Sequence, residues 1–157
     1  MNVLILAAGY GTRLARGIDQ DTRFVRFLDF EALEIYSSGN YAHLKGLPKG
    51  LLPIGSKPLI QHWIDDLSGR DFVEKICVIS NDHFYSQFCA WHETLEGQKV
   101  VLINDGTKSN ETRLGAIGSI QFALDSVDGF RSKEGVTKLF EWFEDDCWIF
   151  YDNFNHF

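Results

Sequence analysis

Short apolar runs that alternate with helix-period segments are the feature that most limits how this chain of 157 residues can fold. Runs of four to eight apolar and β-branched residues have the size of strands, and apolar residues recurring every three or four positions mark helices with one buried face. Such alternation favours an α/β domain with a mostly parallel sheet. The expected strands are Asn2 to Ala7, Val73 to Ser80, Gln98 to Ile103 and Cys147 to Tyr151.

Helices are expected between these strands. The first can open at Pro58, a residue favoured in the first turn of a helix, and ends near Gly69. The second covers about Asp82 to Leu95, with Asp82 as a possible amino-terminal cap. A third is expected over about Arg113 to Val127, and a fourth can cover Lys133 to Glu144.

The composition, 45% hydrophobic and 24% charged, suits one core of ordinary size, so residues 1–157 are interpreted as one domain. Residues 15–46 show no clean period over their whole length. A long segment without regular structure is unusual inside a compact domain, so it is interpreted as an insertion. Within it, FVRFLDFEALEIY can form either a short helix or a strand.

The net charge of -7 argues against a partner recognised through a broad basic surface, such as duplex nucleic acid or an anionic membrane. Neither a signal peptide nor a transmembrane span is expected, because no basic flank precedes a long hydrophobic stretch; this favours a cytoplasmic protein. The three cysteines, Cys77, Cys89 and Cys147, lack CxxC spacing and are interpreted as free buried thiols. Histidines His83 and His92 lack the partners of a zinc site.

The segment LILAAGYGTRL, from Leu4 to Leu14, runs from an apolar strand into two glycines, a threonine and an arginine. In such a turn, main-chain N–H groups can point inward without side chains in the way, which suits a phosphate. Arg13 adds a fork of donors that matches phosphate oxygens. The dinucleotide fingerprint is disfavoured because Leu14 stands where it needs glycine, and GxxxxGK[ST] is absent. The alternative is a plain strand-to-loop turn.

A second motif, LPKGLLPIGSKPLIQHWIDDL, spans Leu47 to Leu67. Together the two motifs resemble those of the nucleotidyltransferases that join a nucleoside triphosphate to a sugar 1-phosphate or similar phosphate ester. That family has the pattern LAAGxGTRL followed by PKxLLPxxxKPLI, and this chain carries LAAGYGTRL and then PKGLLPIGSKPLI. The resemblance implies a Rossmann-like, three-layer nucleotidyltransferase fold with a mostly parallel sheet.

The resemblance also implies roles for residues of both motifs. In relatives the glycine loop wraps the triphosphate, which assigns nucleotide binding to Ala8, Gly9, Gly11 and Thr12. Arg13 and Lys49 would be the catalytic cations that neutralise the phosphates. For Lys57, a role in the site and a place on the surface beside Pro58 are both open.

Two later segments resemble further parts of the family site. Relatives read the base with an amide and a backbone glycine, which Asn110 and Gly115 of SNETRLGAI match; alternatively Ser109 or Asn110 caps the third helix and Gly115 allows close packing. Relatives also end a central strand with an aspartate that holds Mg²⁺, and Tyr151-Asp152-Asn153 is similar, with glycine replaced by tyrosine. An oxygen ligand at the carboxyl edge of the sheet suits that ion, which makes Asp152 the metal candidate.

The implied reaction is attack of an acceptor phosphate on the α-phosphorus of the triphosphate, with release of pyrophosphate and help from Mg²⁺. The part of the family domain that follows the metal-binding aspartate, which supplies the acceptor pocket, has no match here. We therefore expect the fold to be incomplete at its carboxyl end. The alternative function is a non-catalytic nucleotide-binding or interaction module, with a possible protein partner or oligomer; the base and the acceptor stay open.

Overall fold

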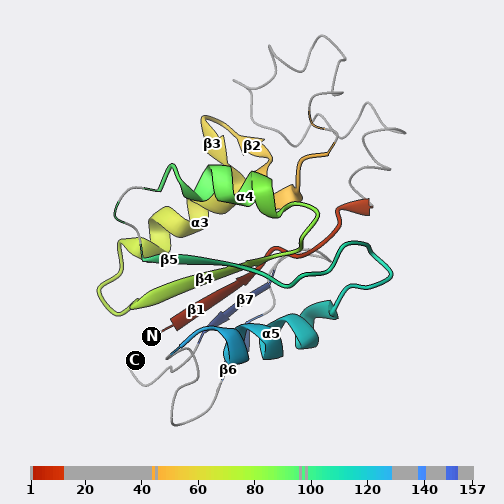
Figure 1. Cartoon of the computed structure of the whole chain (residues 1–157). Coiled ribbons are helices and arrows are strands. Elements are labelled where there is room, and N and C mark those ends of the chain that lie inside the picture. The colour runs from red at the N-terminus through yellow and green to blue at the C-terminus, as the bar shows by residue number, and fades with distance from the viewer. Residues whose placement is uncertain are drawn as a thin grey trace.

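A mixed five-stranded sheet forms the centre of the protein, as Figure 1 shows. The structure is a computed structural model, and it describes residues 2–12, 44, 46–95, 97, 99–128, 138–140 and 148–151. The strand order in the sheet is β5-β4-β1-β7-β6. The strands are β1 (Asn2–Leu6), β4 (Lys75–Ser80), β5 (Val100–Asn104), β6 (Lys138–Phe140) and β7 (Trp148–Tyr151).

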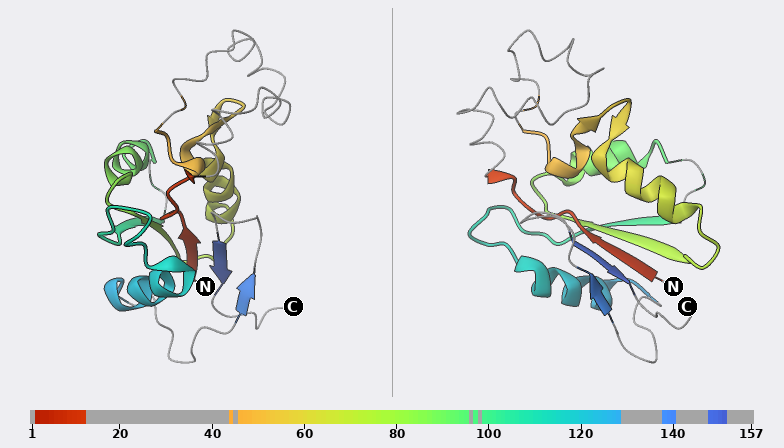
Figure 2. Two further views of the ribbon diagram at one scale, coloured as in Figure 1. Left: turned by 90° about the vertical axis from the view of Figure 1, so that its right-hand side faces the viewer. Right: turned by 180° about the vertical axis from the view of Figure 1, so that it is seen from behind.

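Three helices cover the two faces of this sheet. They are α3 (Leu59–Ser68), α4 (Tyr85–His92) and α5 (Gly115–Ser126). The two views of Figure 2 show α3 and α4 on one face and α5 on the other, so the domain has three layers. Before α3 the chain forms the short 3-10 helix η3 (Lys49–Leu51) and a small hairpin of β2 (Pro53–Ile54) and β3 (Lys57–Pro58).

The prediction of an α/β domain is confirmed, but the sheet is less parallel than expected. Strands β1, β4 and β5 run parallel, with Val3 opposite Ile76 and Ile76 opposite Val100. Strand β7 is antiparallel to β1, and β6 is antiparallel to β7. The prediction of a mostly parallel sheet therefore holds for one half of the sheet and is wrong for the other.

The expected helix over Lys133 to Glu144 is wrong at its centre, where residues 138–140 form β6. Pairing with β7 outweighs the helical period of this short segment, because strand formation depends more on cross-strand neighbours than on local preference. The other residues of that expected helix lie outside the described residues. Most of the interpreted insertion, 15–46, also lies outside them, although Leu44 is buried.

Side chains of β1 alternate between two cores, as the period of two along a strand requires. Val3 and Ile5 belong to the core under α3 and α4, whereas Leu4 and Leu6 belong to the core under α5. Each fully buried apolar side chain stabilises the fold by about 1.5–3 kcal/mol relative to an exposed one. Both faces of β1 are therefore dry, which explains its continuous apolar sequence.

Helix α3 confirms its sequence signals. Pro58 is the N-cap with an extended backbone, Gly69 is the C-cap, and Ile60, Ile64 and Leu67 are buried at spacings of four and three. Lys57 in β3 places its Nζ 2.5 Å from Oδ2 of Asp65 in α3, which favours a structural surface role for this lysine.

Two of the three cysteines lie in the described part of the chain, and both are free. Cys77 is fully buried on β4, and burial raises the pKa of its thiol to about 12. Cys89 on α4 is only half-buried, so the prediction of buried thiols is confirmed for Cys77 alone. Cys147 lies outside the described residues. Among the helices that the structure describes, none has the length and apolar character needed to cross a membrane.

Candidate functional site at the carboxyl edge of the sheet

The parallel strands β1, β4 and β5 end at one edge of the sheet, where three connecting segments meet. We call them the glycine loop (residues 8–12), the β4–α4 turn (residues 81–84) and the β5–α5 loop (residues 105–114). After β1 and β4 the chain crosses one face of the sheet through α3 and α4, and after β5 it crosses the opposite face through α5 (Figure 2). Such a change of face marks where open α/β sheets bind ligands.

A buried asparagine holds the glycine loop to the β4–α4 turn. Asn81 has no exposed surface, and its Nδ2 donates to the carbonyl oxygen of Ala8 at 2.9 Å and, with a longer contact of 3.4 Å, to that of Gly9. Its Oδ1 accepts a hydrogen bond from the main-chain N–H of Phe84 at 3.0 Å. One amide thus fixes the loop after β1 and the turn that leads into α4.

This contact decides where the donors of the glycine loop point. In a trans peptide unit the C=O and N–H bonds point in opposite directions. The carbonyls of Ala8 and Gly9 face Asn81, so the N–H groups of Gly9 and Tyr10 in the same peptide units face away from it. Within the described residues, none accepts a hydrogen bond from these two N–H groups.

Tyr10 links the glycine loop to the β5–α5 loop. Its hydroxyl donates to Thr107 Oγ1 at 3.0 Å, and Thr107 Oγ1 donates in turn to Asp105 Oδ1 at 2.7 Å. The N–H of Thr107 donates to the same carboxylate oxygen at 2.8 Å. Asp105 and Thr107 are buried, at 8% and 7% exposed, so this chain of hydrogen bonds forms a firm base for Tyr10.

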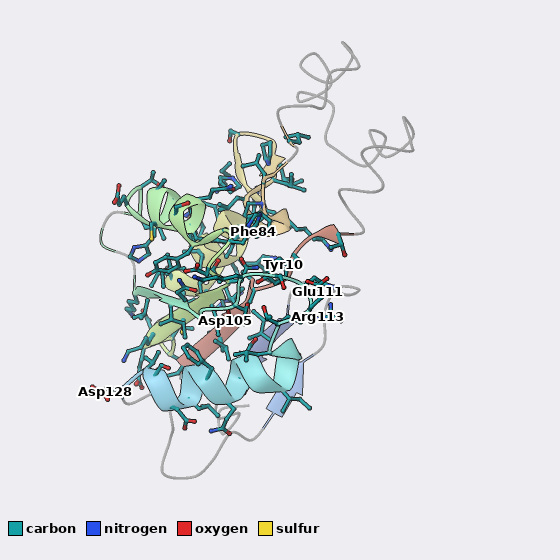
Figure 3. All side chains as sticks on the ribbon, turned by 45° about the vertical axis from the view of Figure 1, so that its right-hand side comes forward. Tyr10, Phe84, Asp105, Glu111, Arg113 and Asp128 are labelled. Atoms are coloured by element: carbon teal, nitrogen blue, oxygen red, sulfur yellow. The ribbon has the colours of Figure 1, made fainter. Side chains whose placement is uncertain are left out.

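The outer part of the β5–α5 loop is held by its own residues. Thr112 and Ser109 exchange hydrogen bonds, including Thr112 N–H to the Ser109 carbonyl at 3.1 Å. Arg113 Nη1 donates to Asn110 Oδ1 at 3.1 Å. A hydrogen bond from Ser109 lowers the pKa of the exposed Glu111 carboxyl. In Figure 3, Glu111 and Arg113 lie at the same end of the molecule as Tyr10, and Asp128 lies at the far end of α5.

The suggested amino-terminal caps of α4 and α5 are wrong. Helix α4 begins after Phe84, and the side chain that accepts an N–H there is that of Asn81, one position before Asp82. Helix α5 has Leu114 as its N-cap, with no side-chain hydrogen bond, so neither Ser109 nor Asn110 caps it. Ser109 and Asn110 belong to the turn that precedes Leu114 and so lie outside the helix.

Gly115 is exposed and its φ is +72°, a left-handed conformation that glycine adopts without strain. A Cβ at this position would meet no atom within 4 Å, so close packing does not explain the glycine. Gly11 in the glycine loop is similar, with a φ of +61° and open space around a Cβ. Two of the three predicted nucleotide-binding glycines, Gly11 and Gly115, therefore have left-handed backbones beside open space.

Lys49 is half-buried in η3, an element that Figures 1 and 2 both show beside the end of the glycine loop. Element η3 packs against α4 at Gly50, where a Cβ would make an ordinary contact at 3.5 Å from the ring of Phe88. The structure thus brings the two sequence motifs together at one edge of the sheet. It also brings Ala8, Gly9, Gly11 and Thr12 to that edge, together with the β5–α5 loop, which carries Asn110 and leads to Gly115, the first residue of α5.

Two predicted residues, Arg13 and Asp152, lie outside the described residues. Tyr151, which precedes Asp152, pairs with Val3, whereas the glycine loop follows Leu6 at the other end of β1. The strand before Asp152 is therefore antiparallel to β1 and does not end at the carboxyl edge that the parallel strands share. No group of three or more His, Cys, Asp or Glu side chains that could hold a metal occurs within the described segments. The magnesium site stays a prediction.

Residues missed by the sequence analysis include Asn81, Asp105 and Thr107. Asn81 and Asp105 directly follow strands at their carboxyl ends, and Thr107 lies two residues beyond Asp105; polar residues of an α/β domain often serve a site there. Asn81 stands between an apolar strand and a helix, a position that indicates a possible helix cap. Its contact with Ala8, 73 positions away, had no signal in the sequence.

No family model matches this chain, and comparisons with curated proteins and with solved structures found no match either. The resemblance to nucleotidyltransferases therefore depends on the two sequence motifs alone.

Proposed function

We propose that the carboxyl edge of β1 binds the phosphate groups of a nucleoside triphosphate. The observation that carries this proposal is the orientation of the glycine loop, whose Gly9 and Tyr10 N–H groups face away from Asn81 and have no acceptor among the described residues. Main-chain N–H groups in a small-residue turn after a strand are ready donors to phosphate oxygens. The acidic net charge makes such a local site necessary.

The resemblance of both motifs supports a nucleotidyltransferase reaction at this site. An acceptor phosphate, of a sugar 1-phosphate or similar ester, attacks the α-phosphorus in line, and pyrophosphate leaves. The protein positions the phosphates with the loop donors, and Arg13 and Lys49 neutralise the leaving group. A bound Mg²⁺ would add charge stabilisation, with Asp152 as the proposed ligand. The fold we propose is the Rossmann-like one of that family.

The base side of the nucleotide is proposed to lie along the β5–α5 loop. Asn110 already accepts a hydrogen bond from Arg113, which fixes the orientation of its amide. Exposed main chain at Gly115, with open space where a Cβ would lie, lets a base approach closely. The hydrogen bond from Tyr10 to Thr107 supports this joint site, because it ties the phosphate loop to the base loop.

The decisive experiment is isothermal titration of the chain with ATP, CTP, GTP and UTP in the presence of Mg²⁺. We expect one of them to bind and the Arg13→Ala variant to bind it at least ten-fold more weakly. The matched control is Arg70→Ala, since Arg70 follows α3 at the opposite edge and pairs with Asp66 at 3.0 Å. Absence of binding for all four nucleotides contradicts the proposal.

A second candidate, a nucleotide-binding module without catalysis, is favoured by one observation. Strand β7 is antiparallel to β1 and ends beside Val3, so the structure does not supply the parallel strand on which the prediction of a metal at the carboxyl edge rested. A pyrophosphate-release assay with sugar 1-phosphates separates the two candidates. Release that is lost in Asp152→Asn supports the enzyme, and nucleotide binding without release from any acceptor supports the module.

A further inference from the structure

We infer that Asn81 is the positioning residue of the phosphate site: its amide holds the Ala8 and Gly9 carbonyls so that the N–H groups of Gly9 and Tyr10 stay turned toward a ligand. This inference rests on the proposed function and adds a residue that belongs to neither sequence motif. Asn81 would not touch the nucleotide. It would act only through the main chain of the glycine loop.

Burial and hydrogen bonding carry the inference. Asn81 is a polar side chain with no exposed surface, and both ends of its amide are used, Nδ2 by the glycine loop and Oδ1 by Phe84. A buried amide with both ends satisfied has one orientation, because rotation by 180° would place donor against donor and acceptor against acceptor. The direction of the Ala8 and Gly9 carbonyls is fixed with it.

Neighbouring contacts do not replace this contact. Ala7 N–H donates to the Ile79 carbonyl, which extends the pairing of β1 with β4 by one residue and ends before Ala8. Tyr10 is held through its side chain by Thr107, which leaves its own peptide unit free to turn. Among the described residues, Asn81 alone makes hydrogen bonds to the peptide units on either side of Gly9.

Two variants test this role. Asn81→Asp keeps an acceptor for Phe84 N–H but removes the donor to Ala8 and Gly9, and so releases the loop. Asn81→Ser replaces the amide by a shorter hydroxyl, which can still accept from Phe84 N–H but loses the reach of Nδ2 to Ala8 and Gly9; because it adds no charge, it separates loss of this contact from repulsion of phosphate. The matched control is Asn104→Asp, because Asn104 lies at the same edge and donates to Asp82 rather than to the glycine loop.

The measurement is titration of each variant with the triphosphate that wild type binds best and with the corresponding nucleoside, after circular dichroism has shown each variant to be folded. We expect both Asn81 variants to bind the triphosphate at least ten-fold more weakly, with the nucleoside and Asn104→Asp changed less than two-fold. A merely structural role would weaken both ligands equally, and that result overturns the inference.

The remaining outcomes are also decisive. If Asn81→Asp does not fold, Asn81→Ser gives the same comparison without a buried charge. Triphosphate affinity within two-fold of wild type in a folded Asn81 variant overturns the inference but leaves the proposed function in place. Failure of wild type to bind any of ATP, CTP, GTP or UTP overturns both.

Discussion

The two loops at the carboxyl edge are stabilised in opposite ways. The glycine loop is held from outside, through Asn81 and through the Tyr10 hydroxyl. The β5–α5 loop is held mostly from within, by pairs such as Asp105 with Thr107 and Arg113 with Asn110, two or three positions apart. The difference teaches that the second loop owes most of its outer shape to its own residues, although Ser80 and Asp82 also bond its first residues, whereas the first loop takes its shape from the rest of the fold.

The largest expected effect is on the β5–α5 loop. Asp105→Ala removes the acceptor of two buried hydrogen bonds from Thr107, at 2.7 and 2.8 Å. We expect the free energy of unfolding to fall by about 3 kcal/mol, because a charged acceptor is lost and buried donors are left without a partner. Urea denaturation measures this. Asp105→Asn, which keeps one oxygen, should lose less, and an unchanged midpoint in Asp105→Ala would mean that the loop is not held from within.

The left-handed glycines of the two loops form a matched pair. Gly11→Ala and Gly115→Ala each place a side chain at a positive φ without a clash, so each should destabilise the fold by about 1 kcal/mol. Gly69→Ala is the control, because Gly69 has a φ of -73° and a Cβ there makes only ordinary contacts. Thermal denaturation of the three variants measures the loss of stability. Equal stability of Gly115→Ala and wild type would show that the loop tolerates another conformation.

The bridge between the loops should contribute less. The hydrogen bond from Tyr10 to Thr107 is only part-buried, and we expect a coupling energy of about 0.5–1 kcal/mol. A double-mutant cycle with Tyr10→Phe and Thr107→Val isolates it, since the separate loss of the Thr107 bond to Asp105 cancels in the cycle. A coupling energy of zero would show that the two loops are held independently.

The smallest effect concerns the titration of Glu111. Its pKa is lowered by the hydrogen bond from Ser109, so the folded state gains stability above the unfolded pKa and loses it as the pH falls through the folded pKa. Ser109→Ala should raise the pKa of Glu111 and reduce this loss at low pH. Carbon-detected NMR titration of the carboxyl gives the midpoint, and identical midpoints in the two proteins would remove Ser109 as the cause.

Periodicity predicted those parts of the fold in which burial dominates. Strand β1 and helix α3 were expected within one or two residues, because Leu4, Ile60 and Ile64 lie on faces that must be covered. The direction of β7 was not predictable in this way, because an apolar run has the same pattern whether the strand is parallel or antiparallel to its neighbour.

The candidate site was predictable where its residues form contiguous motifs. The glycine loop and Lys49 were found because they lie in LAAGYGTRL and PKGLLP, and the structure brings both to one edge. Asn81 was missed because its role depends on a contact with a distant chain segment, and the residues next to it in the sequence do not indicate that contact. The sequence pattern suggested Asp82 as the cap of α4, whereas the N-cap is Phe84, whose N–H donates to Asn81.

The contact from Asn81 to Ala8 also has a consequence for folding. Its two residues are 73 positions apart, with residues 13–43 and helix α3 between them. Closing so long a loop costs chain entropy before the contact forms, so contacts of this kind belong to the late, slow part of folding. The glycine loop therefore acquires its shape only after β1 and β4 have paired, and a nascent chain that ends before residue 81 carries the motif without the geometry.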